Sequence, residues 1–170
     1  MKETIKWGLL FTIVVAIAWL INASFEKVRA AKSAKEKLST LPAFSLTALD
    51  SSAIESSSFD YAPLVLIYFN SECDHCQYEA QDIKNNIAGF SKATIVFMSS
   101  EPLAKIKAFA ENGSLNDHAN VSFTKITSHD AFTAFGTLAV PHVFIYGPDK
   151  RLRKEFKGET KAEAILKYLN

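Results

Sequence analysis

The two cysteines of this chain, Cys73 and Cys76, stand in a single C-x-x-C motif and are the residues best placed to do chemistry. The motif lies where a continuous apolar run, residues 64–69, meets a stretch of helical character, residues 72–87. A helix N-terminus offers partial positive charge and unpaired N–H groups that stabilise a thiolate. Because the thiolate is the nucleophile of disulfide exchange, the motif predicts a redox-active pair that alternates between a dithiol and a Cys73–Cys76 disulfide.

The two sulfurs are expected to have different roles. Cys73, at the first turn of the predicted helix, would attack a substrate disulfide, and Cys76, one turn further along the same face, would resolve the mixed disulfide from a more buried position. His75 would favour the thiolate if protonated, although an exposed polar helix position accounts for it equally well. Glu72 and Asp74 oppose the thiolate electrostatically, so the preference for reduction or oxidation stays open.

A zinc site, a structural disulfide and a pair of ordinary core cysteines are weaker interpretations of the motif. A zinc site needs two more ligands, whereas the chain has no other cysteine and His118, His129 and His142 are scattered along it. A structural disulfide would close a loop of only four residues, worth about 2 kcal/mol. Two ordinary core cysteines would have no reason to share this junction. We therefore expect no metal and no organic cofactor, since the dithiol itself carries the electrons.

Composition sets the broad class of the protein. The 170 residues are 48% hydrophobic with a net charge of +1, which gives no sign of nucleic-acid binding and allows one domain with a short extension. Two cysteines exclude a disulfide-dense secreted scaffold. The charge is divided unevenly, because residues 1–40 carry seven basic and three acidic side chains and the remaining 130 carry 12 basic and 15 acidic ones.

The N-terminal segment is predicted to be a transmembrane anchor, residues 1–25. Residues 7–25 contain no charge, and a helix of this length spans about 28 Å, close to the thickness of a bilayer core. Trp7 and Trp19 lie near its two ends, where amphipathic rings favour the interface. A cleaved signal peptide is the main alternative, although Ile21-Asn22-Ala23 matches a cleavage site poorly. A buried core helix is a third.

Residues 26–40 are predicted to be a basic helical stalk that leads to the globular domain, residues 41–170. Five Lys or Arg follow the apolar segment against two before it, and this bias would place the domain in the cytoplasm. Short N-terminal anchors commonly export the domain attached to them, and disulfide chemistry fits export. We expect a single-pass protein of the cytoplasmic membrane whose redox domain lies on the extracytoplasmic side.

The globular domain shows an α/β pattern after Pro42. Predicted strands occupy residues 43–48 (at a sheet edge), 64–69, 94–98, 121–123, 142–146 and 152–156. Predicted helices occupy residues 72–87, 101–111, 130–135 and 163–169. Residues 50–60 are rich in turn formers. This order predicts a mixed sheet with helices on both faces.

The domain resembles the thioredoxin superfamily, in particular the membrane-anchored thiol–disulfide oxidoreductases of TlpA/ResA type, which are related to the AhpC/TSA redoxins. The resemblance covers about residues 41–170 and is carried by Leu41-Pro42-Ala43-Phe44-Ser45-Leu46, by the strand that feeds the C-x-x-C, and by Val140-Pro141 before residues 142–146. It implies a thioredoxin fold. It also implies protein disulfides as substrates and a membrane dithiol as electron donor or acceptor.

Two site residues are implied by the resemblance. In that superfamily a cis proline opposite the C-x-x-C shapes the substrate groove; Pro141 matches it, and Val140 would present its backbone to an extended substrate. An acid three residues after the second cysteine is also typical, so Glu79 would relay the proton of Cys76. A routine proline at a strand start and an exposed helical glutamate are the plainer interpretations of these residues.

The sequence departs from the family pattern around the motif. Asn70-Ser71-Glu72 replaces the tryptophan that usually precedes the first cysteine, and neither Asp74 nor His75 is proline. These departures leave the fold expectation unchanged but leave the substrate and the redox potential open.

A thiol peroxidase of the related peroxiredoxin branch is the enzymatic alternative. Its pattern looks like P-x-x-x-T-x-x-C, but counting back from Cys73 gives Asn70 and Leu66 where Thr and Pro should stand. No arginine that could polarise a peroxide lies between Arg29 and Arg151. A non-enzymatic alternative is a Cu(I)-handling or redox-sensing module that uses the two cysteines and His75, because soft thiolates favour Cu(I).

Overall fold

The computed structural model describes residues 36–59, 62–136 and 138–169, together with residues 17, 19–22, 24–26, 29 and 33. The chain divides into two compact units, Met1–Glu36 and Lys37–Asn170. Most of the predicted anchor, residues 1–25, lies outside the described residues. Among those that are described, no helix combines the length and the apolar character needed to cross a membrane.

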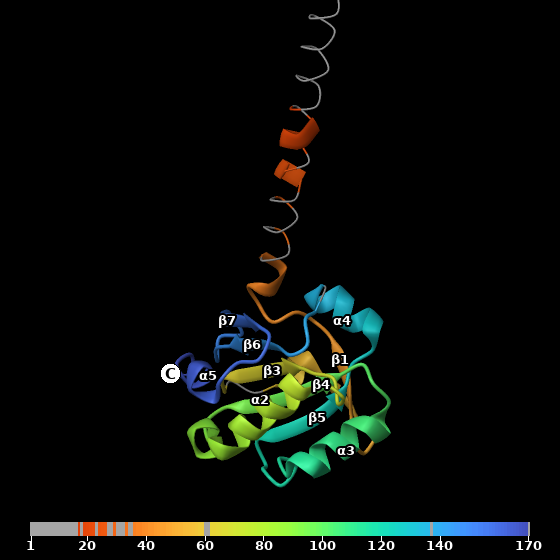
Figure 1. The fold of residues 1–170 in the computed structure, drawn as a ribbon, viewed down its shortest axis with the longest axis vertical. Helices are drawn as coiled ribbons and strands as arrows, with labels where there is room; N and C mark the ends of the chain where they lie inside the picture. Colours follow the sequence, from red (N-terminus) through yellow and green to blue (C-terminus); the bar gives the residue numbers. More distant parts are fainter. Residues whose placement is uncertain are drawn as a thin grey trace, which may run out of the picture. The chain divides into compact units, whose positions relative to one another are not determined.

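The larger unit is built on one mixed sheet, drawn as arrows in Figure 1. In spatial order its strands are β2 (Ala53–Glu55), β1 (Ser45–Ala48), β5 (Val121–Lys125), β4 (Thr94–Ser99), β3 (Leu64–Tyr68), β6 (His142–Tyr146) and β7 (Leu152–Lys157). The three central strands β3, β4 and β5 are parallel, while β6, β7, β1 and β2 are added antiparallel. The mixed sheet expected from the sequence is confirmed.

Helices cover both faces of this sheet. On one face α2 (Asp74–Asn85), α3 (Leu103–Gly113) and α5 (Ala162–Leu166) enclose a core that includes Val65 and Ile67 of β3. On the other, α4 (Ser128–Phe135) packs over a second core that includes Leu64 and Leu66. Two short 3-10 turns, η1 (Ser56–Ser58) and η2 (Ile87–Phe90), complete the unit. Figure 1 shows α2 and α3 lying along the sheet and α4 apart from them.

The strand that leads to the cysteines is buried because its sequence is apolar on both sides. Leu64, Val65, Leu66 and Ile67 are each no more than 1% exposed. Successive strand residues point to opposite faces, so an uninterrupted apolar run fits a strand with helices above and below it. This strand lies between β4 and β6, and its carboxyl end delivers the chain to the first cysteine.

Two boundaries differ from the sequence-based expectation. Residues 43–48 were expected at a sheet edge, but β1 lies inside β2, a three-residue strand within the stretch expected to consist of turns. The compact unit also begins at Lys37, four residues before the expected start of the domain. The reason is that Leu38 is buried in the second core and the Leu152 amide donates to the Ser39 carbonyl.

Candidate functional site

The cysteine motif stands at the start of α2, with Cys73 as its N-cap rather than in its first turn. The Cys73 carbonyl accepts hydrogen bonds from the amides of Cys76 (3.0 Å) and Gln77 (3.1 Å), so the helix begins on this residue. Cys73 is partly exposed, whereas Cys76 is 2% exposed. Both are free thiols in this structure. The exposure of the two sulfurs suits an attacking and a resolving cysteine.

The loop before β6 brings Val140 and Pro141 to the cysteine motif. The Val140–Pro141 peptide bond is cis, and the Cys73 thiol lies 4.0 Å from the Val140 carbonyl oxygen. The antiparallel pairing of β3 with β6 sets Tyr68 opposite His142, which accounts for this contact between residues 67 positions apart. The structure thus brings together the first cysteine and both residues of the expected substrate groove.

The pKa of the Cys76 thiol is raised, chiefly by burial. Hydrogen bonding to Cys73 and the nearby charges of Cys73 and Glu79 act in the same direction, while the backbone of Asn70 opposes them. A buried thiol of this kind needs a base before it can attack a disulfide. Glu79, three residues further along α2, is close enough for its charge to act on the pKa of Cys76 and could serve as that base.

Glu79 is buried, not on the helix surface, with 1% of its area exposed. Neither carboxyl oxygen has a hydrogen-bond partner of good geometry among the described residues. The pKa of this carboxyl is raised to about 8, chiefly by burial and also by the charges of Glu159 and Asp82, while the Thr160 amide opposes the rise. A carboxyl group with this pKa exchanges its proton near neutral pH, as a proton relay to Cys76 requires.

His75 lies on the exposed side of α2 and is paired. Its side chain is 69% exposed, and Nδ1 lies 2.8 Å from Oε2 of Glu159, 84 positions later in the chain. This hydrogen bond to His75, together with Lys161, holds the pKa of Glu159 below its usual value. The sequence allows either a thiolate-stabilising residue or an exposed polar one. The structure places His75 at the surface, with its ring held by Glu159.

One face of α2 is covered by the segment that joins β7 to α5. His75, Glu79 and Asp82 share this face through their helical spacing. All three face residues 159–162: His75 through the Glu159 carboxylate, Glu79 towards the Thr160 amide, and Asp82 by accepting the Ala162 amide at 2.7 Å. This cover is what excludes solvent from Glu79, and no pattern in the sequence indicates it.

The loop that replaces the usual tryptophan, Asn70-Ser71-Glu72, is held by α3 and the residues just before it. Glu101 accepts hydrogen bonds from the Ser71 amide (2.6 Å) and the Ser71 hydroxyl (2.8 Å). Lys105 pairs with Glu72 at 2.6 Å and lowers the pKa of that carboxyl. Glu72 is therefore less effective in opposing a Cys73 thiolate than its charge alone suggests. No sequence motif marks Glu101 or Lys105 for these roles.

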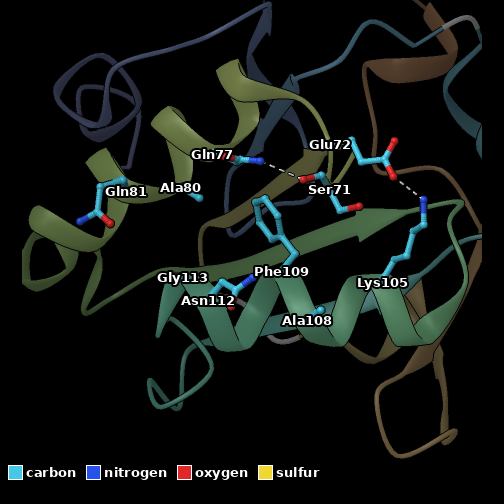
Figure 2. Close-up of a pocket in the computed structure, with 10 residues that line it drawn as sticks. All are labelled: Ser71, Glu72, Gln77, Ala80, Gln81, Lys105, Ala108, Phe109, Asn112 and Gly113. Atoms are coloured by element: carbon cyan, nitrogen blue, oxygen red, sulfur yellow. Dashed lines mark hydrogen bonds and ion pairs between the residues drawn. The ribbon is translucent and has the colours of Figure 1, made fainter.

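A groove of about 370 Å³ runs beside this loop between α2 and α3. Figure 2 shows its apolar floor at Phe109 and its polar rim, where the side-chain amide of Gln77 donates to the Ser71 carbonyl. It is lined by Ser71, Glu72, Gln77, Ala80, Gln81, Lys105, Ala108, Phe109, Asn112 and Gly113. Gln77 and Gln81 occupy the face of α2 opposite that of His75 and Glu79. The groove thus lies on the other side of α2 from His75 and Glu79.

Solved structures of similar fold include disulfide oxidoreductases. A secreted disulfide oxidoreductase of Mycobacterium tuberculosis, homologous to E. coli DsbE, is 17% identical with a TM-score of 0.63, covering 79% of this chain and 96% of that one. A putative protein disulfide isomerase from Bacteroides thetaiotaomicron is 18% identical with a TM-score of 0.64, over 78% and 89%. The peroxidoxin BcpB of M. tuberculosis is 18% identical with a TM-score of 0.63, over 76% and 93%.

At these identities the likeness establishes the thioredoxin-like fold, and the first two neighbours agree with the enzyme class predicted from the sequence. No match was found among curated proteins. The model of the AhpC/TSA family matches residues 39–155, which is more than half of the chain and includes the cysteine motif, Glu79 and the cis proline. The chain belongs to the AhpC/TSA family.

Proposed function

We propose that this protein is a membrane-anchored thiol–disulfide oxidoreductase of TlpA/ResA type that reduces disulfides of exported proteins through Cys73 and Cys76. The observation that carries the proposal is the arrangement around the motif. A partly exposed Cys73 faces the Val140 carbonyl, and a buried Cys76 shares its helix with a buried Glu79 that lacks a hydrogen-bond partner among the described residues. An attacking sulfur, a resolving sulfur and a base are the three groups that dithiol exchange needs.

In the first step the Cys73 thiolate attacks one sulfur of the substrate disulfide. A bond forms between Cys73 Sγ and that sulfur, and the other substrate sulfur leaves as a thiolate and takes a proton from water. Val140 is exposed beside Cys73, and its backbone would support this step by pairing with the extended chain around the substrate cysteine. The start of α2 contributes unpaired N–H groups that favour the attacking thiolate.

In the second step the Cys76 thiol gives its proton to the Glu79 carboxylate and attacks Cys73 Sγ. The mixed disulfide breaks, a Cys73–Cys76 disulfide forms, and the second substrate sulfur leaves as a thiolate, so that two electrons pass from the protein to its substrate. A base is needed because burial raises the pKa of the Cys76 thiol. A membrane protein with its own dithiol would then reduce the pair and complete the cycle.

The uncharged segment at residues 7–25 supports anchoring to the cytoplasmic membrane, with the redox domain outside the cytoplasm. This topology opposes the Lys/Arg bias around the segment, so it has its own test. Alkaline phosphatase is active only after export, and a fusion after Asn170 should therefore be active. An inactive fusion with normal expression would place the domain in the cytoplasm.

A peroxidase is the second candidate, because one structural neighbour is a peroxidoxin. In that reaction the Cys73 thiolate would attack the O–O bond and form a sulfenic acid, which Cys76 would convert to the disulfide with release of water. The sequence disfavours it. Asn70 and Leu66 stand where the peroxidase pattern has Thr and Pro, and no arginine lies between Arg29 and Arg151 to polarise the peroxide.

The test compares three activities on the full chain in detergent: reduction of insulin disulfides, consumption of hydrogen peroxide and binding of Cu(I). Disulfide reduction should exceed the other two. Cys76→Ser should accumulate mixed disulfides through Cys73, and the matched variant Cys73→Ser should accumulate none. The proposal fails if the wild-type protein reduces no disulfide although both thiols are alkylated normally after mild unfolding.

A further inference from the structure

His142 is a buried imidazole placed directly after the cis peptide bond. It is the first residue of β6 and is 1% exposed. Its ring stacks on that of Phe144, with centroids 4.3 Å apart and planes 26° apart. A buried polar side chain normally has hydrogen-bond partners for its polar atoms. The hydrogen-bond partners of the two ring nitrogens therefore indicate the role of this side chain.

Both ring nitrogens of His142 are in contact with a polar group. Nδ1 lies 3.4 Å from the Ala139 amide nitrogen, and Nε2 lies 2.8 Å from Oε1 of Glu155 on β7. A backbone amide can only donate, so Nδ1 accepts and carries no proton. The proton of the neutral ring is therefore on Nε2, which donates to the Glu155 carboxylate. In this way Glu155 fixes the tautomer that Ala139 needs.

The bond from Ala139 to His142 spans the cis peptide. The two residues enclose Val140 and Pro141, so the imidazole closes the bend that presents the Val140 carbonyl to Cys73. The Gly158 amide holds the other end of the bend by donating to the Pro141 carbonyl at 2.9 Å. The backbone offered to a substrate is thus fixed by one side-chain bond and one main-chain bond.

We propose that His142, with its tautomer set by Glu155, is a positioning residue that holds residues 139–141 in the conformation that pairs with the backbone of an extended substrate. It acts through the loop and touches no reacting atom. It therefore sets the affinity for disulfides carried on a polypeptide and leaves the exchange of small disulfides unchanged. The inference rests on the proposed function, because it names the class of disulfide that the same site selects.

Two matched variants separate the two bonds of the ring. His142→Asn places a carboxamide oxygen near the position of Nδ1 and keeps an acceptor for the Ala139 amide. His142→Gln places a carboxamide nitrogen near the position of Nε2 and keeps a donor to Glu155. Both side chains are neutral and smaller than the ring, so both lose the contact with Phe144. A role limited to core packing would affect the two variants alike.

The first experiment measures KM and kcat of the full chain for a peptide disulfide, with hydroxyethyl disulfide as the small-substrate control. His142→Gln should raise KM for the peptide about five- to tenfold, the value of one hydrogen bond, with kcat unchanged. His142→Asn should keep KM near that of the wild type, and neither variant should change the rate with hydroxyethyl disulfide. Equal losses in both variants, or equal losses with both substrates, would overturn the inference.

The second experiment needs no variant and no activity. In ¹⁵N NMR spectra of the wild-type protein, His142 should show a protonated Nε2 and an unprotonated Nδ1. A proton on Nδ1 would overturn the inference even if both His142 variants failed to fold. If the protein exchanged neither the peptide disulfide nor hydroxyethyl disulfide, the proposed function would fail, while the tautomer would still decide whether His142 can hold the Ala139 amide.

Discussion

Two buried titratable side chains reach the site from different regions, and they differ in hydrogen bonding and in the direction of their pKa shifts. On the α2 side, Glu79 has no hydrogen-bond partner for either carboxyl oxygen among the described residues, and burial raises its pKa to about 8. On the β6–β7 side, both ring nitrogens of His142 are hydrogen-bonded. Burial lowers the pKa of His142, with Glu155 opposing it, and the ring stays neutral.

The difference separates proton transfer from positioning. A buried carboxyl without partners changes its protonation state near neutral pH, so it can take a proton during a reaction. A buried imidazole with both nitrogens occupied keeps one tautomer and can hold a loop in place. Substitutions of Glu79, of Glu155 beside His142 and of Glu159 in the cover of α2 test this distinction, with effects that should decrease in that order.

Glu79→Gln should slow the resolution of the mixed disulfide by about 10²- to 10⁴-fold, because the base that accepts the Cys76 proton is lost. In the wild type the resolution rate should rise with pH and level off above about pH 8, as Glu79 ionises. Stopped-flow release of a fluorescent peptide thiol from Cys73 would measure this step. Glu163→Gln, an exposed substitution on α5, is the control. If Glu79→Gln resolved the mixed disulfide at the wild-type rate, Glu79 would have no role in the mechanism.

Glu79 should also make stability depend on pH. Its pKa is about 8 in the folded state against an ordinary 4.5, so between these values the folded protein binds more protons than the unfolded one. The free energy of unfolding therefore falls as pH rises from about 4.5 to about 8. Glu79→Gln should abolish this fall. The stability difference between variant and wild type should change by roughly 3–4 kcal/mol from pH 5 to pH 9 in urea unfolding. If the free energies of unfolding of variant and wild type changed with pH in parallel, the assigned pKa would be contradicted.

Glu155→Ala should lower the free energy of unfolding by about 1–3 kcal/mol, because it leaves the buried Nε2–H group of His142 without an acceptor. Glu155→Gln should lower the free energy of unfolding less than Glu155→Ala does, since its side-chain amide oxygen can accept the same hydrogen bond. Urea unfolding at pH 7 would measure both. If the two variants were equally destabilised, the bond from Nε2 to Glu155 would contribute nothing, and the tautomer of His142 would have to be fixed in another way.

The exposed pair of His75 and Glu159 should give the smallest effect. Glu159→Gln removes one charge from a solvent-exposed pair, and pairs of this kind contribute little in water. We expect no measurable shift in the midpoint of urea unfolding at pH 7 and an unchanged rate of Cys73 alkylation. A clear change in alkylation would show that the segment covering α2 tunes the attacking thiol.

The elements closest to the site could be predicted because their sequences leave little choice. Residues 64–68 and 142–146 are strands in the structure because long apolar runs need burial on both faces, and the C-x-x-C motif marks the start of α2. β2 could not be predicted, because three residues in a serine-rich stretch form a strand only by pairing with β1. The partners of the site residues escaped prediction for a related reason, since His75 meets Glu159 across 84 positions.

The amino-acid sequence by itself determines the chemistry of this protein: it has one pair of cysteines, at a spacing and at a junction that favour a thiolate, and no further cysteine. The control of that chemistry depends on tertiary contacts. Burial of Glu79 depends on residues 159–162, and the conformation of Val140 depends on His142 and Glu155. Solvent exclusion and hydrogen-bond partners are properties of elements brought together by folding, so no local pattern encodes them.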